Sequence, residues 1–247
     1  MRKYFFTYLA FACMSGTIAQ TFGTVNASQV SGTSSNSAAI SYLLGDVDSQ
    51  KEKRKEIDLE DIQGSAYTSN VFEPGKLYYK DNFESDVFYR YNAYMEEIEI
   101  KNDNIPSSPV SGLRRDKNIN LRNSDGNLVS FKTFIDNSGL TQNGYLTLLS
   151  DGEYKFYKRV DVKFTEGQKA QNSFVKAIPP RFSQFTEYYL EVPGRDRIDE
   201  LVINNRKLLK LLPADKQKTV KTYLKEKKIK VKDEADVIAV LKWLEQH

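Results

Sequence analysis

The strongest constraint on the fold is an alternation of apolar and polar side chains over residues 154–164. The first series comprises Tyr154, Phe156, Val160, Val162 and Phe164, and the second comprises Lys155, Tyr157, Arg159, Asp161 and Lys163. Lys158 is the one mismatch. Successive side chains of a β-strand point to opposite faces, so a half-buried strand explains the pattern. The preceding Asp151-Gly152 pair suits a type I′ turn, which predicts a β-hairpin with residues 145–149 as the partner strand.

Other short segments rich in β-branched and aromatic residues lie between turn residues, and we expect each to form a strand. They are residues 77–80, 87–91, 95–100, 118–122, 128–135 and 187–192. Strands spaced about eight to twelve residues apart, without helical patterns between them, are typical of an antiparallel β-sandwich or a partly open barrel. The sequence therefore predicts an antiparallel β domain over residues 57–197.

From residue 198 onward, apolar residues recur at helical spacing. They include Leu201, Leu208, Leu209, Leu211, Leu212, Val220, Tyr223, Leu224, Val237, Ile238, Leu241 and Leu244. Asp233 is expected to cap the last helix, and Pro213 to occupy a first helical position. The predicted fold class is mainly β (α+β), with a lysine-rich helical segment over residues 198–247.

The N-terminus has the layout of a secretory signal peptide over residues 1–19. Arg2 and Lys3 precede an apolar run at 4–12, and small residues lead to Ala19, after which cleavage is expected. The run is shorter than the roughly 20 residues that a membrane span needs, so no transmembrane span is predicted. Lipidation at Cys13 is the alternative, which the bulky Phe11 disfavours. We therefore expect an exported protein, either periplasmic or extracellular at the cell surface.

Residues 20–56 are predicted to be a flexible tether, rich in Ser and Thr at first and then densely charged. Asp46 and Asp48 resemble the start of a calcium loop. The pattern fails at Lys51, where the tight-turn glycine belongs, and at Ile57, where the bidentate glutamate belongs. A solvated segment is the interpretation that we retain.

Composition excludes several kinds of catalytic and metal site. The only cysteine is Cys13, inside the predicted signal peptide, and the only histidine is His247, the last residue. The processed chain would therefore lack disulfides, thiolate metal sites, histidine-based acid–base groups and ordinary zinc sites. We expect no metal and no cofactor, and the sequence favours a non-enzymatic protein.

Carboxylates offer the one enzymatic alternative. Glu96, Glu97 and Glu99 cluster in a predicted strand, and glycoside hydrolysis uses paired carboxylates. Alternation places Glu97 and Glu99 on the face opposite Ile98, which predicts a solvent-facing side. If the protein is a carboxylate-dependent hydrolase of envelope polymers, its candidate residues are Glu97, Glu99 and Asp161.

Residues 90–94 combine arginine with two tyrosines, a composition that can stack on sugar rings or bases. The interpretation that we favour is structural: Val87, Tyr89 and Tyr91 would form one strand face against the core.

Residues 205–232 hold an unusual concentration of positive charge. The basic residues are Arg206, Lys207, Lys210, Lys216, Lys218, Lys221, Lys225, Lys227, Lys228, Lys230 and Lys232. Only Asp215 and Glu226 oppose these eleven, which leaves +9, whereas the processed chain with 34 basic and 33 acidic residues carries +1.

Four of these lysines, at three- and four-residue steps, form a predicted stripe on one helix face: Lys218, Lys221, Lys225 and Lys228. The stripe is either a solvated face or a binding surface for an anionic partner. Lipid head groups, a cell-wall polymer or another envelope protein are favoured as partners over nucleic acid.

Several short segments also carry a resemblance. They are residues 64–67 (Gly-Ser-Ala-Tyr), Phe72, 75–78 (Gly-Lys-Leu-Tyr), 90–94 (Arg-Tyr-Asn-Ala-Tyr), 98–100, 144–146, 157–159, 188–189 and the Lys/Leu-rich end. Over residues 57–247 they resemble a group of uncharacterised secreted proteins of Bacteroidota, although Ala66 stands where that group has a proline. The resemblance implies an envelope location and identifies no catalytic residues. The leading hypothesis is thus a non-enzymatic binding or scaffolding component of the cell envelope.

Overall fold

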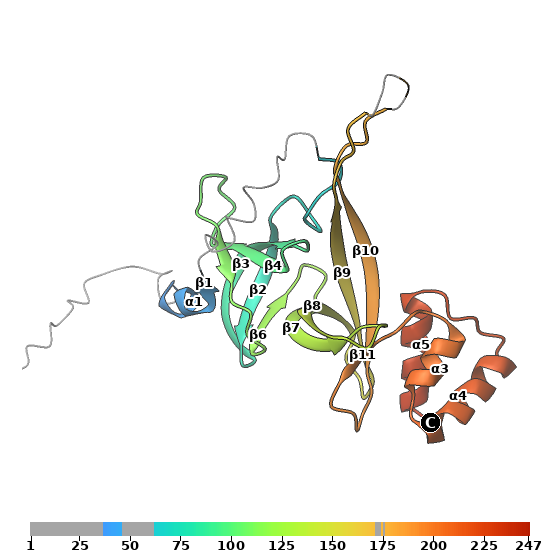
Figure 1. Ribbon diagram of the computed structural model, residues 1–247. Coiled ribbons are helices and arrows are strands. Elements are labelled where there is room, and N and C mark those ends of the chain that lie inside the picture. The colour runs from blue at the N-terminus through green and yellow to red at the C-terminus, as the bar shows by residue number, and fades with distance from the viewer. Residues whose placement is uncertain (1–36, 46–61, 171–173, 175) are drawn as a thin grey trace, which may run out of the picture. The chain divides into compact units, whose positions relative to one another are not determined.

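The computed structural model describes residues 37–45, 62–170, 174 and 176–247, which form an antiparallel sheet and a set of helices (Figure 1). The helices are α1 (Ser37–Leu43), α3 (Asn205–Leu211), α4 (Ala214–Glu226) and α5 (Glu234–Glu245). The strands are β1 (Leu44–Gly45), β2 (Glu73–Tyr79), β3 (Asn82–Asn92), β4 (Glu97–Lys101), β5 (Ser111–Leu113), β6 (Ile119–Arg122), β7 (Leu128–Ile135), β8 (Thr141–Ser150), β9 (Lys155–Thr165), β10 (Arg181–Glu191) and β11 (Ile198–Glu200). The predicted signal peptide and most of the predicted tether lie outside the described residues.

Among the described strands, neighbours follow the order β1-β5-β4-β3-β2-β6-β7-β11-β10-β9-β8, and β7 also pairs with β8. These pairings are antiparallel except that of β11 with β7, which joins only Asp199 to Ile135. The predicted fold class is therefore confirmed: a mainly antiparallel sheet, sandwich-like or open rather than a closed barrel, is followed by C-terminal helices.

The strands predicted from the sequence are present with shifted boundaries, and β7 matches its prediction at both ends. The largest shift is in β10, which begins at Arg181 rather than at residue 187. The sequence did not reveal β5 and β11, because three residues are too few to show a period of two.

The β8–β9 hairpin is present, but the predicted type I′ turn at Asp151-Gly152 is wrong. Neither residue has a positive φ, which that turn requires at both positions. Gly152 instead allows α5 to approach, because a Cβ there would overlap the Glu245 carboxylate. That carboxylate accepts a hydrogen bond from the Tyr154 N–H, 3.2 Å away. The loop geometry is thus set by a helix far away in sequence.

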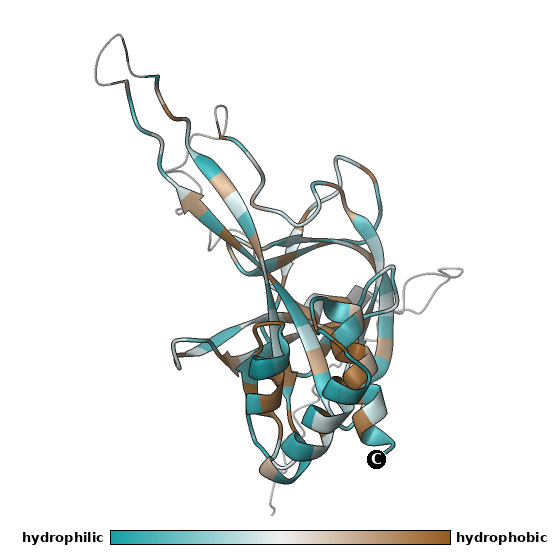
Figure 2. Ribbon diagram, turned by 90° about the vertical axis from the view of Figure 1, so that its right-hand side faces the viewer, coloured by the Kyte–Doolittle hydropathy of each residue, from teal (hydrophilic) through white to brown (hydrophobic). Residues whose placement is uncertain are grey.

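Alternation along β9 holds for most of its length, and Figure 2 shows hydrophobic and hydrophilic residues alternating along the long strands. The exception is Tyr157, which was predicted on the polar face but is buried with Phe134 and Tyr189. Lys158, the mismatch in the pattern, points to the helices and forms an ion pair with Glu234 of α5 at 2.9 Å. Both departures arise because β9 is covered on its two faces.

The helical segment begins later than residue 198. Residues Ile198–Glu200 form β11, and α3 starts only at Asn205, where Asn204 caps it by accepting a hydrogen bond from the Lys207 N–H. Pro213 is the N-cap of α4, one position before its predicted place, whereas the Asp233 cap of α5 is confirmed.

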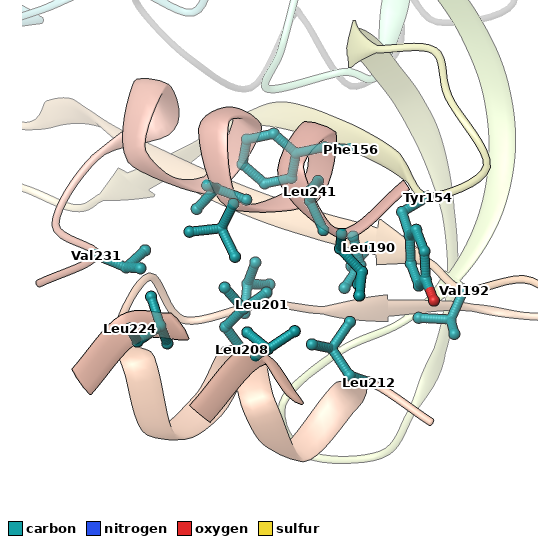
Figure 3. Packing of buried hydrophobic residues seen from close by; sticks show 14 residues of the cluster. Tyr154, Phe156, Leu190, Val192, Leu201, Leu208, Leu212, Leu224, Val231 and Leu241 are labelled. Atoms are coloured by element: carbon teal, nitrogen blue, oxygen red, sulfur yellow. The ribbon is translucent and has the colours of Figure 1, made fainter. Parts of the chain in front are cut away.

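The helices share a hydrophobic core with β9 and β10 (Figure 3). Phe156 of β9 and Leu190 of β10 meet Leu208, Leu224 and Leu241 of the three helices. The predicted boundary between a β domain over residues 57–197 and a helical segment therefore separates most of the strands from the C-terminal helices. It does not separate two hydrophobic cores. The described residues between 37 and 247 belong to one compact unit.

The structure describes one part of the predicted tether, residues 37–45. In residues 37–45, Ile40 and Leu43 are buried, and β1 pairs with β5. This part of the tether is structured, because Leu43 belongs to the sheet core and β1 adds a short strand to the sheet.

Candidate functional site: a basic groove on the C-terminal helices

Three of the four stripe lysines lie on α4. Lys218, Lys221 and Lys225 are exposed, whereas Val220 and Leu224 of the same helix are buried in the shared core. This amphipathic pattern fixes the rotation of α4, because the apolar side must face the sheet and the lysines must then face water.

Lys228 lies beyond α4 rather than on it. The helix ends at Glu226, and the Ile229 N–H donates to the Leu224 carbonyl at 2.9 Å while the Lys228 N–H donates to the Lys225 carbonyl at 3.2 Å. These two bonds are those of a Schellman motif. Lys228 occupies its left-handed position with φ 55°, where glycine is usual. The turn thereby keeps Lys228 on the same side of the helix end as Lys225.

Helices α3 and α4 and the turn after α4 border an open groove of about 1230 Å³. Its apolar lining consists of Leu209, Ala214, Leu224 and Ile229. Its basic lining consists of Arg206, Lys210, Lys218, Lys221, Lys225, Lys228 and Lys230. All four predicted site residues therefore line one concave site, and α3 and the 228–230 turn add three more positive charges.

The groove walls are tied together by side-chain amides. Asn205 of α3 donates from Nδ2 to the Ile229 carbonyl at 2.9 Å, and its Oδ1 accepts from the Val231 N–H at 2.7 Å. Gln217 of α4 donates to the Leu212 carbonyl at 3.0 Å. Each bond joins segments that border the groove and so helps to hold its walls together.

The electrostatic character of the groove is uniform. Neither Asp215 nor Glu226 of α4 is among its lining residues, and no other carboxylate is. Within the described part of the chain, none of the seven basic groups lies within 4.0 Å of a carboxylate oxygen. Like charges concentrated in a concave surface create a positive potential that attracts anions.

A second charged cluster lies in the sheet, around Arg159. Its guanidinium contacts Glu96, through both Nε at 3.0 Å and Nη2, and Glu187 through Nη1 at 2.8 Å. Asp161 lies 3.4 Å from Nη2. Burial disfavours the charged guanidinium, but Glu96 and Glu187 outweigh that effect and raise the pKa of Arg159 above its usual value.

Tyrosines and a glycine complete the Arg159 cluster. The Tyr91 hydroxyl donates to Glu96 at 2.5 Å, and the Tyr189 hydroxyl donates to Glu187 at 2.9 Å. A Cβ on Gly144 would lie 3.1 Å from the Glu96 carboxylate oxygens, so the glycine leaves room for that carboxylate. The cluster thus joins β3, β8, β9 and β10 to the turn before β4.

Two of the carboxylates proposed for a hydrolase, Glu99 and Asp161, have different arginine partners. Glu99 is 1% exposed and accepts two hydrogen bonds from Arg90, at 2.6 and 2.8 Å, whereas Asp161 is held at Arg159. The prediction that Glu97 and Glu99 face solvent is wrong, because every residue of β4 is buried. The carboxylates that do converge with Asp161 are Glu96 and Glu187.

Residues 90–94 have the structural role that the sequence favoured. Val87 and Tyr91 are buried in the core. Arg90 is stacked between Tyr67, with its Cζ 4.0 Å from the ring centroid, and Phe72, at 4.7 Å. This arginine is therefore committed to aromatic and carboxylate partners inside the protein.

Comparisons of the chain with family models, with curated proteins and with solved structures found no match. The described residues include no cluster of three or more His, Cys, Asp or Glu side chains suited to a metal ion. None of the helices in those residues combines the length and apolar character needed to cross a membrane.

Sequence reasoning found four of the seven basic groove residues but missed Arg206, Lys210 and Lys230 as members of the site. All three had been counted among the basic residues of segment 205–232. The spacing of residues along one helix, however, does not show which residues of a neighbouring helix face it.

Proposed function

We propose that this protein is an exported, non-enzymatic binding component of the bacterial cell envelope, and that it holds an anionic partner in the basic groove. The observation that supports this most directly is the lining of the groove: seven basic side chains converge there, and its lining by described residues includes no carboxylate. A merely solvated lysine face would need neither a concave shape nor the exclusion of carboxylates. The envelope location rests on the predicted signal peptide.

The expected affinity follows from the charges. A lysine near an anionic membrane surface contributes about 1 kcal/mol, so four lysines contribute about 4 kcal/mol, enough for weak and reversible association. Exposed charges are screened by salt, because the Debye length falls from about 30 Å at 0.01 M to about 8 Å at 0.15 M ionic strength. Binding should therefore depend strongly on ionic strength.

The test is co-sedimentation with vesicles of phosphatidylglycerol, and with vesicles of phosphatidylcholine as the uncharged reference. We expect binding to the anionic vesicles at low salt and its loss at physiological salt. A variant with Lys218, Lys221, Lys225 and Lys228 all changed to glutamine should bind at least tenfold more weakly.

The chain offers a matched control for that variant. Four basic residues of the same segment do not line the groove: Lys207, Lys216, Lys227 and Lys232. Changing these four to glutamine removes the same charge but leaves the groove intact, so anionic binding should be retained. The proposal fails if the native protein does not bind at low salt, or if the two fourfold variants lose binding equally.

A further inference from the structure

The floor of the groove has a property that electrostatic docking does not require. Leu209 and Ile229 are only half-buried, and they line the groove together with Ala214 and the inner residue Leu224. Apolar surface in contact with water is unfavourable, and a ligand that covers it gains from its removal. The groove thus combines an apolar floor with a cationic rim.

We propose that the groove binds a phosphorylated lipid, whose alkyl chain lies on the apolar floor while the lysines hold its phosphate. This inference rests on the proposed function and specifies the chemistry of the partner. Arg206 and Lys210 border the groove from α3, and Lys221 and Lys225 border it from α4, so an anionic group can be contacted from both sides.

The number of charges favours phosphate over carboxylate. A phosphate monoester carries about −1.5 to −2 at neutral pH and offers three acceptor oxygens, whereas a carboxylate carries one charge. Lysine ammonium groups bind phosphate as point charges, and each can donate three hydrogen bonds. Several unpaired ammonium groups around one groove are therefore best matched by a multiply charged head group.

The shape favours a single lipid molecule over an acidic protein segment. Ligand sites commonly have volumes of about 300–1,000 Å³, and the groove, at about 1230 Å³, is large enough for a chain with its head group. The contacts of Asn205 and Gln217 hold the walls in place, so little ordering is needed on binding. A polyanion without a chain would leave Leu209 and Ile229 exposed to water.

The experiment is isothermal titration calorimetry with dioctanoyl phosphatidic acid below its critical micelle concentration. Glycerol 3-phosphate supplies the head group without chains, and dioctanoyl phosphatidylcholine supplies the same chains with a zwitterionic head group. We expect phosphatidic acid to bind at least tenfold more tightly than either, because only it contacts both the floor and the rim.

A variant that fills the groove tests the location. Ala214 is exposed at the first position of α4, so Ala214→Trp adds bulk over the floor without changing charge or the core. Binding of phosphatidic acid should fall at least tenfold. Ala235→Trp is the matched control, because Ala235 is also an exposed residue in the first turn of a helix, α5, and it does not line the groove.

The outcomes separate this inference from the proposed function. If glycerol 3-phosphate binds as tightly as phosphatidic acid, or if Ala214→Trp leaves lipid binding unchanged, the lipid site is overturned while vesicle binding can persist. Tighter binding of poly-glutamate than of phosphatidic acid would show that the groove is a site for acidic protein segments and would also overturn it. Loss of vesicle binding in the native protein would instead refute the proposed function.

Discussion

In the sheet, Arg159 is surrounded by three carboxylates. In the C-terminal helices, by contrast, seven basic side chains border a groove that no carboxylate of the described residues lines. The Arg159 side chain is only 14% exposed, and a charge so far removed from water must be paired to persist. The groove lysines remain hydrated and need no internal partner. The difference distinguishes a charge that holds the fold together from charges that are available to a ligand.

The largest expected effect is that of Arg159→Met. The substitution keeps most of the side-chain volume but leaves Glu96, Asp161 and Glu187 close together without a cation. Removing one partner of a buried ion pair costs about 3–5 kcal/mol, and the partial exposure of this cluster suggests about 3 kcal/mol. Urea denaturation followed by circular dichroism measures the change.

Lys221→Met is the corresponding change in the groove, and it should alter the free energy of unfolding by less than about 0.5 kcal/mol, as is usual for exposed sites. The contrast between the two regions would be refuted by equal effects of the two substitutions.

The second prediction concerns stability at alkaline pH. The sheet is the sensitive region, because it contains buried tyrosines. Burial, assisted by the charge of Glu73, raises the pKa of Tyr89 to about 12. Burial likewise raises the pKa of Tyr91, Tyr145 and Tyr189. Because these pKa values are raised on folding, their contribution to stability is complete below the unfolded value of about 10 and is lost as the pH rises through the folded values.

We therefore expect unfolding to accompany ionisation of the buried tyrosines. Because their pKa values are raised, the midpoint of unfolding should lie at about pH 11 or above. Tyrosinate absorbance and circular dichroism, recorded on one sample, report the two events. Ionisation of every tyrosine near pH 10 with the fold intact would contradict the buried environment of these residues.

The smallest expected effect is a gain at the edge of the groove. Lys228 has a φ of 55°, a conformation that glycine adopts most readily. Lys228→Gly should therefore make the protein about 0.5–1 kcal/mol more stable. Lys228→Ala removes the same charge but keeps the backbone strain, and it should show no such gain. Thermal unfolding of the two variants distinguishes them. A gain of equal size in both would indicate relief of charge repulsion instead.

Periodicity along the chain was enough to predict β7, most of β9 and the buried side of α4, because alternation or helical spacing places their apolar side chains in the cores. It failed for β4, whose glutamates were expected in water. That strand lies between β3 and β5, and Arg90 with Tyr67 covers Glu99 from segments that the pattern cannot place. The turn at Lys80-Asp81 was missed for a different reason, since positive φ values at lysine and aspartate leave no glycine to signal them.

The candidate site divides in the same way. The spacing of Lys218, Lys221 and Lys225 is a property of one helix and could be predicted. The position of Lys228 depends on a Schellman motif without glycine, and the contributions of Arg206 and Lys210 depend on how α3 packs beside α4. The Arg159 cluster depends on five chain segments and has no local signature.

The core shared by the helices and the sheet affects how the protein folds while it is being synthesised. Proteins are synthesised from the N-terminus, so β9 and β10 exist before the helices that cover Phe156 and Leu190. Until residues 208–244 are available, that face of the hairpin remains uncovered, and exposed apolar strands are prone to aggregate. The nascent protein would therefore be most vulnerable just before α5 is released, when all of the described strands are present and the last covering helix is missing.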